Sequence, residues 1–194
     1  MVAALRAELD GVFESANVPV LYCGVGKVNA AIALTRELAR YGSNGEPMPK
    51  VVNFGSAGSR RFASGALVEC HEIIQRDMDV SGLGFPHGVT PFDDAPACLS
   101  FERVFDHLPA AICGSGDSFA TADTALDCEV DGRRSAVVDM EAYALAKTCW
   151  AAGALFCCAK YVSDGADHAA ASDWQQNVHR AADQFLGLYH RLAP

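Results

Sequence analysis

The sequence has no long hydrophobic run and no excess of positive charge. No segment approaches the roughly 18 consecutive apolar residues that a membrane-spanning helix needs. The first ten residues include acidic side chains and contain no apolar stretch of the kind found in a signal peptide. The net charge is −9, which argues against binding to a nucleic-acid phosphate backbone, because that requires a basic surface. We therefore expect a cytoplasmic protein with neither a membrane nor a nucleic acid as partner.

Cysteine is present, but the spacings that would give it a special role are missing. Eight cysteines lie mostly within apolar runs, without a Cys-x-x-Cys pair and without zinc-finger spacing to histidine. Because no signal peptide is recognisable, we expect reduced, buried thiols that behave as small hydrophobic side chains. The sequence accordingly predicts no metal site and no cofactor.

What the sequence does contain is the composition of a globular protein, with 51% hydrophobic and 20% charged residues. Strand-like runs alternate with segments of helical periodicity, which implies parallel pairing of the strands. The strand-like runs are 18–24, 50–55, 65–74, 110–116, 135–140 and 154–163, and the helical segments are 27–41, 140–152 and 174–192. We predict one α/β domain over residues 1–194, a three-layer sandwich whose central, mixed but mostly parallel twisted sheet is flanked by helices.

Three glycine-rich turns directly follow predicted strands. Their sequences are GVGKVNAA at 24–31, NFGSAGS at 53–59 and GSGDSF at 114–119. NFGSAGS fits neither the Walker pattern nor the dinucleotide pattern GxGxxG, and each turn taken alone is explained by ordinary turn geometry. In a parallel sheet, however, all three would open at the carboxyl edge, where α/β proteins bind ligands.

Acidic residues occupy the ends of two further strands. Asp139 and Glu141 lie where a strand passes into a helix, and the helix dipole accounts comfortably for one such acid. Asp164 follows the apolar run 154–163 and precedes Gly165. It is therefore either a residue that forms a turn or a buried acidic residue of a ligand-binding site at the end of a strand. Glu8, taken alone, is typical of an exposed helical glutamate.

Taken in order, these segments resemble the nucleoside phosphorylase superfamily, and most of all the 5′-methylthioadenosine/S-adenosylhomocysteine nucleosidases. The resemblance runs from residue 3 to about residue 175. It rests on the segments AALRAEL, CGVGKVNAA, VVNFGSAGS, DMDV, CGSGDSF, VVDMEAYALA and SDGAD. It implies a nucleoside phosphorylase-like fold and cleavage of the bond between a purine and ribose through an oxocarbenium-like transition state.

The resemblance also implies a catalytic pair and a ribose site. Asp164 matches the acid that donates a proton toward N7 of the purine, with Ser163 orienting it, and burial would keep that carboxyl protonated near neutral pH. Glu8 matches the base that takes a proton from water. Glu141 matches the glutamate that binds the ribose hydroxyls, and Met140 would pack against the sugar.

The remaining matching positions would line the rest of the substrate site. Ser56 matches a residue near the water and the sugar, and Phe119 matches the aromatic side chain beside the purine. The backbone at Ala120 would read the edge of the base. Trp174 falls where the family places a phenylalanine on the 5′ side, and Val25 belongs to the GVGK turn.

Hydrolysis is favoured over phosphorolysis by one position. Phosphorylases of this superfamily carry an arginine that clamps phosphate just before the FGS turn, whereas this chain has Asn53. The resemblance thus implies a hydrolase acting on a 5′-substituted adenosine such as methylthioadenosine or S-adenosylhomocysteine, in methionine salvage. The alternatives are phosphorolysis, a futalosine-type substrate, or a nucleoside-binding protein without catalysis, the last suggested by a short N-terminal region. A loop from a second subunit completes the family's pocket, so the resemblance also implies a homodimer.

Overall fold

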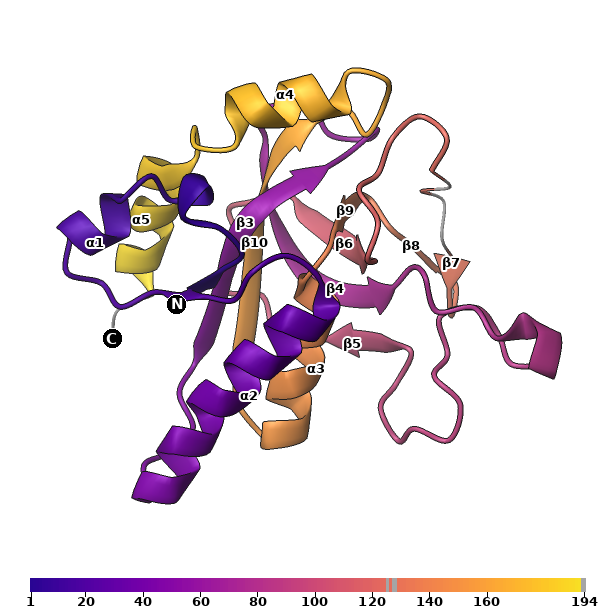
Figure 1. Ribbon diagram of the computed structural model, residues 1–194, viewed down its shortest axis with the longest axis horizontal. Coiled ribbons are helices and arrows are strands. Elements are labelled where there is room, and N and C mark those ends of the chain that lie inside the picture. Colours follow the sequence, from indigo (N-terminus) through magenta and orange to yellow (C-terminus); the bar gives the residue numbers. More distant parts are fainter. Residues whose placement is uncertain (125, 127–128, 193–194) are drawn as a thin grey trace.

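Residues 1–124, 126 and 129–192 are described by the computed structural model (Figure 1). A mixed sheet lies at the centre, with helices on both sides of it. The strands of this sheet are β1 Val2–Ala3, β2 Leu21–Tyr22, β3 Val51–Gly58, β4 Leu67–Gln75, β5 Cys98–Ser100, β6 Ala110–Ser115, β9 Val137–Asp139 and β10 Phe156–Asp164. The short strands β7 Glu129–Val130 and β8 Arg133–Arg134 form a separate ribbon.

The sheet closes on itself. Its strand order is β10-β4-β6-β9-β3-β1-β2, and β10 also pairs with β3. The β10–β3, β4–β6, β6–β9, β1–β3 and β1–β2 pairs are parallel, whereas β10–β4, β3–β9 and β4–β5 are antiparallel. The mixed, mostly parallel α/β sheet was therefore predicted correctly. The pairing of β10 with β3 makes this central sheet barrel-like, and the three-layer sandwich stays a prediction.

Strands β3 and β10 are the centre of this arrangement. All nine residues of β10 are buried, and only one residue of β3 is not fully buried. A strand covered on both faces needs apolar side chains at nearly every position. The sequence FCCAKYVSD of β10 meets this requirement apart from Lys160 in its middle and the polar residues at its end. Those polar residues must find partners inside the protein, which makes the end of β10 the natural place for a site.

Two groups of helices cover the sheet. The helices are α1 Val12–Ser15, α2 Lys27–Asn44, α3 Ala142–Ala152, α4 Ala170–Asn177 and α5 Ala182–Arg191, with 3-10 turns η1 Arg6–Glu8 and η2 Ser81–Leu83. Figure 1 shows α2 beside α3 at one side of the sheet, and α1 beside α5 at another. On the α5 side, Phe54 of β3 stacks on Phe185 with ring centroids 4.8 Å apart. Helix α2 ends at Gly45, whose positive φ of 69° permits the left-handed C-cap.

Several local predictions differ from the structure. The single helix expected over 174–192 is two helices, α4 and α5, and α4 begins earlier, at Ala170. Strands β5, β7 and β8 were not predicted, because two or three residues are too few to show a periodicity. The seven cysteines in the described part of the chain are free and buried, as expected. Cys128 lies outside the described residues.

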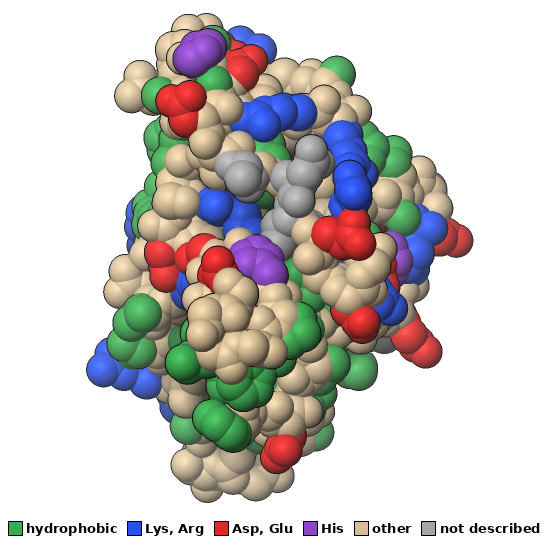
Figure 2. Space-filling model, turned by 90° about the vertical axis from the view of Figure 1, so that its right-hand side faces the viewer, with side chains coloured by type: hydrophobic (Ala, Val, Ile, Leu, Met, Phe, Trp, Pro, Cys, Tyr) green, Lys and Arg blue, Asp and Glu red, His purple; other side chains and the backbone are tan. Residues whose placement is uncertain are grey.

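The described part of the surface carries charges of both signs. On the face in Figure 2, basic and acidic side chains lie side by side. Ion pairs among the described residues include Arg133 with Glu72 and Arg134 with Glu129. Within the described residues, no helix has both the length and the apolar character needed to cross a membrane. The same residues contain no cluster of His, Cys, Asp and Glu side chains suited to a metal ion.

Candidate active site

A cavity of about 350 Å³ lies where β3, β6, β9 and β10 end. These strands end in the glycine-rich and acidic segments singled out in the sequence, so the chain brings those segments to one place. Every predicted site residue lines this cavity: Glu8, Val25, Ser56, Phe119, Ala120, Met140, Glu141, Ser163, Asp164 and Trp174.

Glu8 is buried and fully hydrogen-bonded, although its sequence context is that of an exposed residue. It is 4% exposed and ends the 3-10 turn η1. Its Oε2 accepts hydrogen bonds from the backbone N–H groups of Ala4 and Leu5, both at 3.0 Å. Its Oε1 accepts from the backbone N–H of Ser56 at 2.8 Å and from the Ser56 hydroxyl at 2.9 Å. All the partners are donors, so both carboxyl oxygens of Glu8 act as acceptors.

Asp164 ends β10 at an irregularity in the sheet. The pairing of β10 with β3 shifts register between Val162 and Asp164, and such irregularities next to sites re-aim a side chain. The Asp164 carboxyl is 2% exposed, accepts from the backbone N–H of Ala166 at 2.9 Å, and accepts from the Ser163 hydroxyl at 2.8 Å. Burial raises the pKa of Asp164, and these two hydrogen bonds oppose that rise only in part.

Glu141 lines the same cavity and has a strongly raised pKa. Burial and the neighbouring negative charge of Asp139 raise the pKa of Glu141 to about 8. Its Oε1 accepts a 2.8 Å hydrogen bond from the backbone N–H of Gly26, at the start of α2. The GVGK turn therefore orients the Glu141 carboxyl.

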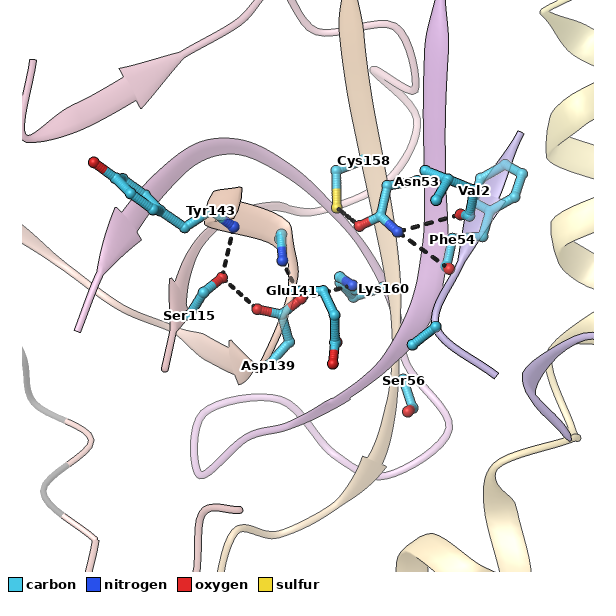
Figure 3. Close-up of polar contacts among 12 residues, drawn as sticks. Val2, Asn53, Phe54, Ser56, Ser115, Asp139, Glu141, Tyr143, Cys158 and Lys160 are labelled. Atoms are coloured by element: carbon cyan, nitrogen blue, oxygen red, sulfur yellow. Dashed lines mark hydrogen bonds and ion pairs between the residues drawn. The ribbon is translucent and has the colours of Figure 1, made fainter. Parts of the chain in front are cut away.

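A buried ion pair lies beside Glu141 (Figure 3). Lys160 Nζ, from β10, is 2.8 Å from Asp139 Oδ2, and both side chains are almost completely buried. Asp139 also accepts hydrogen bonds from the Ser115 hydroxyl and from the backbone N–H of Ala142. Burial alone would raise the pKa of Asp139, but the Lys160 ammonium holds this pKa below its usual value. Asp139 thus ties β6, β9, β10 and α3 together, a role beyond the helix-dipole interpretation.

The remaining predicted residues form the walls of the cavity. Trp174, from α4, donates its indole N–H to the Ser56 hydroxyl at 3.1 Å, which links the predicted 5′ wall to Glu8. Phe119 is 42% exposed and Val25 is 43% exposed, so both form an open rim. Ala120 is buried and belongs to a small apolar cluster with Val138, another lining residue.

Two lining residues of chemical interest were not predicted. Arg76, directly after β4, lines the cavity with a side chain that is mostly buried. Ser118, before Phe119, accepts hydrogen bonds from Arg76 through both its carbonyl and its hydroxyl. The sequence held no signal for this contact, because the two residues are 42 positions apart.

Asn53 does not take part in the cavity. Its side-chain amide donates to the carbonyls of Val2 and Phe54, and its Oδ1 accepts from the Cys158 thiol at 3.3 Å (Figure 3). All of these contacts lie inside the protein. The position that would carry a phosphate-binding arginine is therefore occupied by a structural amide.

The site has the parts needed to break a bond between a base and a sugar. It combines a buried acid with a raised pKa, a second carboxylate held beside a serine hydroxyl, and a third carboxyl on another wall. A general acid and a general base on separate elements are the usual equipment for glycosidic cleavage. The family model of the phosphorylase superfamily matches residues 11–193.

The chain belongs to the phosphorylase superfamily, in the family of the 5′-methylthioadenosine/S-adenosylhomocysteine nucleosidases. A relative of that name from Haemophilus influenzae (strain PittGG) is 30% identical over 203 residues, which cover 94% of this chain and 85% of the relative.

Solved structures of related proteins share the fold. Futalosine hydrolase of Helicobacter pylori strain 26695 superimposes with a TM-score of 0.82 at 20% identity, covering 98% of this chain and 94% of that one. S-adenosylhomocysteine nucleosidase of Streptococcus pyogenes, in complex with 5-methylthiotubericidin, gives a TM-score of 0.80 at 21% identity, covering 100% and 95%. At these identities the likeness establishes the fold.

Proposed function

We propose that this protein is a nucleosidase that hydrolyses the N-glycosidic bond of a 5′-substituted purine nucleoside. The names of its relatives direct the first trials to adenosine derivatives such as methylthioadenosine and S-adenosylhomocysteine. The observation that carries the proposal is the meeting of Glu8, Glu141 and Asp164, from distant parts of the sequence, in one buried cavity.

Asp164 is assigned the role of general acid. Its pKa is raised by burial, so the carboxyl retains a proton at higher pH than an exposed aspartate does. As the bond between C1′ and N9 breaks, the carboxyl donates that proton to N7, and the base leaves as a neutral molecule. Ser163 and the N–H of Ala166 fix the direction of the carboxyl.

Glu8 is assigned the role of general base. The attacking water is assigned to the position beside Glu8 that the Ser56 hydroxyl now occupies. Three of the four donors to Glu8 are backbone N–H groups, so the Ser56 hydroxyl is the one contact that a bond rotation can release. A water that takes its place at Oε1 is positioned to attack C1′ and to give its proton to Glu8. Trp174 keeps the hydroxyl nearby through its own N–H.

Glu141 and Met140 are assigned to the ribose. A protonated Glu141 can both donate to and accept from the sugar hydroxyls, and its pKa of about 8 keeps it protonated at neutral pH. Met140 lies beside it in the cavity lining. Phe119 and the backbone at Ala120 are assigned to the purine, and Val25 and Trp174 to the rim and the 5′ side.

The proposal includes a single domain and a homodimer in solution. An apolar groove of about 820 Å³ lies between α2 and α3, away from the cavity. It is lined by Val28, which is 68% exposed, and by Met48, which is 38% exposed. Apolar surface of this kind is typical of an interface with a partner, and the 81–96 segment would then complete the neighbouring subunit's site.

The test of the proposed function is a product assay with a panel of 5′-substituted purine nucleosides, with and without phosphate. We expect free base and a reducing sugar, at rates that do not depend on phosphate. Ribose 1-phosphate as the product would show phosphorolysis instead. Saturable binding with no turnover, unchanged in Asp164→Asn and Glu8→Gln, would identify a binding protein and refute the proposal.

A further inference from the structure

Helix α4 lies at the end of β10, beside the cavity (Figure 1). Among its eight residues, all of which the structure describes, only Ala170 is buried, whereas a helix held by core packing buries an apolar stripe. Its side-chain hydrogen bonds to the sheet come from Trp174 and Asn177. These two residues are three positions apart, so they lie on one face of the helix. The position of α4 thus depends on contacts at the site rather than on the core.

Trp174 acts on the proposed base through a serine. Its indole N–H donates to the Ser56 hydroxyl at 3.1 Å, and this hydroxyl donates to Glu8 Oε1 at 2.9 Å. Because the indole nitrogen only donates, the serine oxygen is the acceptor and the hydroxyl hydrogen stays directed at Glu8. Hydrogen bonds in such a chain polarise and strengthen one another. Trp174 thereby limits the positions to which the hydroxyl can turn when water takes its place at Glu8.

Asn177 acts on the proposed acid through the backbone. Its side-chain amide donates to the Ser163 carbonyl at 2.9 Å, and the Ser64 hydroxyl also donates to this carbonyl, at 3.2 Å. The carbonyl belongs to the planar peptide unit that joins Ser163 to Asp164. The pairing of β10 with β3 is irregular at this point, so donors from outside the sheet can hold the peptide. Holding the peptide plane fixes the point from which the Asp164 side chain starts.

Helix α4 also brings a charge close to the acid. Burial is the main cause that raises the pKa of Asp164, and the negative charge of Asp173, on α4, adds to this rise. A neighbouring negative charge favours the protonated form of a carboxyl group. The helix that holds the Ser163 peptide therefore also favours the form of Asp164 that can donate a proton.

We propose that α4 positions both catalytic groups of this site, with Trp174 acting through Ser56 on Glu8 and Asn177 acting through the Ser163 peptide on Asp164. Because one short helix makes both contacts, a displacement of α4 would disturb the acid and the base together. The inference rests on the proposed function and adds two positioning residues to the same site. Double-mutant cycles test it, because residues of one hydrogen-bond network have non-additive effects whereas independent residues have additive ones.

The test on the side of the base is a cycle of Trp174 and Ser56. Trp174→Phe removes the indole N–H but keeps an aromatic wall. It should lower kcat by about tenfold, with a smaller change in KM, which is the order expected for one lost hydrogen bond. In a Ser56→Ala background the same replacement should change kcat by less than about twofold, because the path to Glu8 is already cut.

The test on the side of the acid is a cycle of Asn177 and Asp164. Asn177→Leu keeps the size of the side chain, removes the donor, and should lower kcat by about tenfold. In an Asp164→Asn background it should change the residual kcat by less than about twofold, because no acid remains to be positioned. Gln175→Ala, at an exposed position of the same helix, is the control and should leave kcat unchanged in every background.

Additive effects in either cycle would overturn the inference. A residue that only stabilises α4 lowers kcat by the same factor whether or not its partner is present. Additivity would therefore assign Trp174 or Asn177 to the stability of the helix alone.

If no nucleoside is cleaved, the proposed function fails, and NMR spectroscopy decides on the positioning by itself. The chain has two tryptophans, so the indole N–H signal of Trp174 can be told from that of Trp150. A shift of the Trp174 signal in Glu8→Gln, together with a shift of the Asn177 side-chain amide signal in Asp164→Asn, would support the inference. If either signal stays unchanged, the inference is refuted.

Discussion

The carboxyl groups of this site differ because their surroundings differ. Glu8 accepts hydrogen bonds from four donors, Asp164 accepts from two while being buried, and Glu141 is buried beside the negative charge of Asp139. Environments that push pKa values apart are how one site supplies both acid and base chemistry near neutral pH. At the residue scale, function therefore depends on these contacts rather than on residue type.

Replacing Asp164 by asparagine should abolish the acid while keeping the acceptor of the Ala166 N–H. We expect kcat to fall by roughly 10²–10⁴, the usual contribution of a general acid, with an unchanged circular dichroism spectrum. The matched control is Asp167→Asn in the same turn, where the exposed side chain accepts only from the backbone N–H of Ala169. Near-native turnover in Asp164→Asn would disprove the assigned role.

The raised pKa of Glu141 has a consequence for stability. The pKa of about 8 in the folded state exceeds the ordinary value of 4.5, so between these pH values the unfolded chain loses a proton that the folded chain keeps. The contribution of Glu141 to the free energy of unfolding is fully present below pH 4.5 and is lost as the pH rises to about 8. The native protein should therefore lose roughly a few kcal/mol relative to Glu141→Gln over this range.

Urea unfolding at several pH values measures this difference directly. Glu102→Gln, at an exposed position, is the control and should follow the native protein at every pH. If the gap between the native protein and Glu141→Gln stayed constant from pH 5 to pH 8, Glu141 would not carry the raised pKa.

At the scale of elements, the site depends on the close approach of β3 to β10 and to η1. The irregular register at the end of β10 places Asp164 beside Gly58 of β3. A Cβ at Gly58 would lie 2.8 Å from Asp164 Oδ1, and a Cβ at Gly55 would lie 3.0 Å from Glu8 Oε1. The small residues of the NFGSAGS segment thus make room for two carboxyl groups, which is a more specific role than turn formation.

The variant Gly58→Ala should therefore displace the Asp164 carboxyl while leaving its chemical group unchanged. We expect kcat to fall at least tenfold and stability to fall by about 1–3 kcal/mol, as in other overpacked sites. Gly187→Ala in α5 is the control, because a Cβ there meets nothing within 4 Å, and alanine in a helix should stabilise the protein by about 0.5–1 kcal/mol. Full activity in Gly58→Ala would show that Asp164 does not need its observed position.

At the scale of the whole molecule, the proposed dimer would form through the groove between α2 and α3. We expect sedimentation equilibrium to show a dimer, and Val28→Asp to shift it to a monomer with at least tenfold lower kcat/KM, because a charge in an apolar interface remains unpaired. Leu155→Asp is the control, since Leu155 is 66% exposed, like Val28 at 68%, but lies outside the groove. A native monomer with full activity would contradict the proposed dimer.

The sequence by itself determined the long buried strands and the chemistry at their ends. The strands around β3, β6, β9 and β10 were predictable because buried strands are apolar and end in glycine or polar residues. The α/β class followed from their alternation with helices. The family motifs pointed to Asp164, Glu8 and Glu141, although the local context of Glu8 alone indicated an exposed residue.

Only the tertiary structure decided how these elements meet. Closure of the sheet depends on β10 pairing with both β3 and β4, and pairings between distant segments leave no periodicity in either strand. Burial of Glu8 depends on its contact with Ser56, 48 residues away. Hydrogen bonds and ion pairs follow spatial neighbours, and only folding makes these residues neighbours.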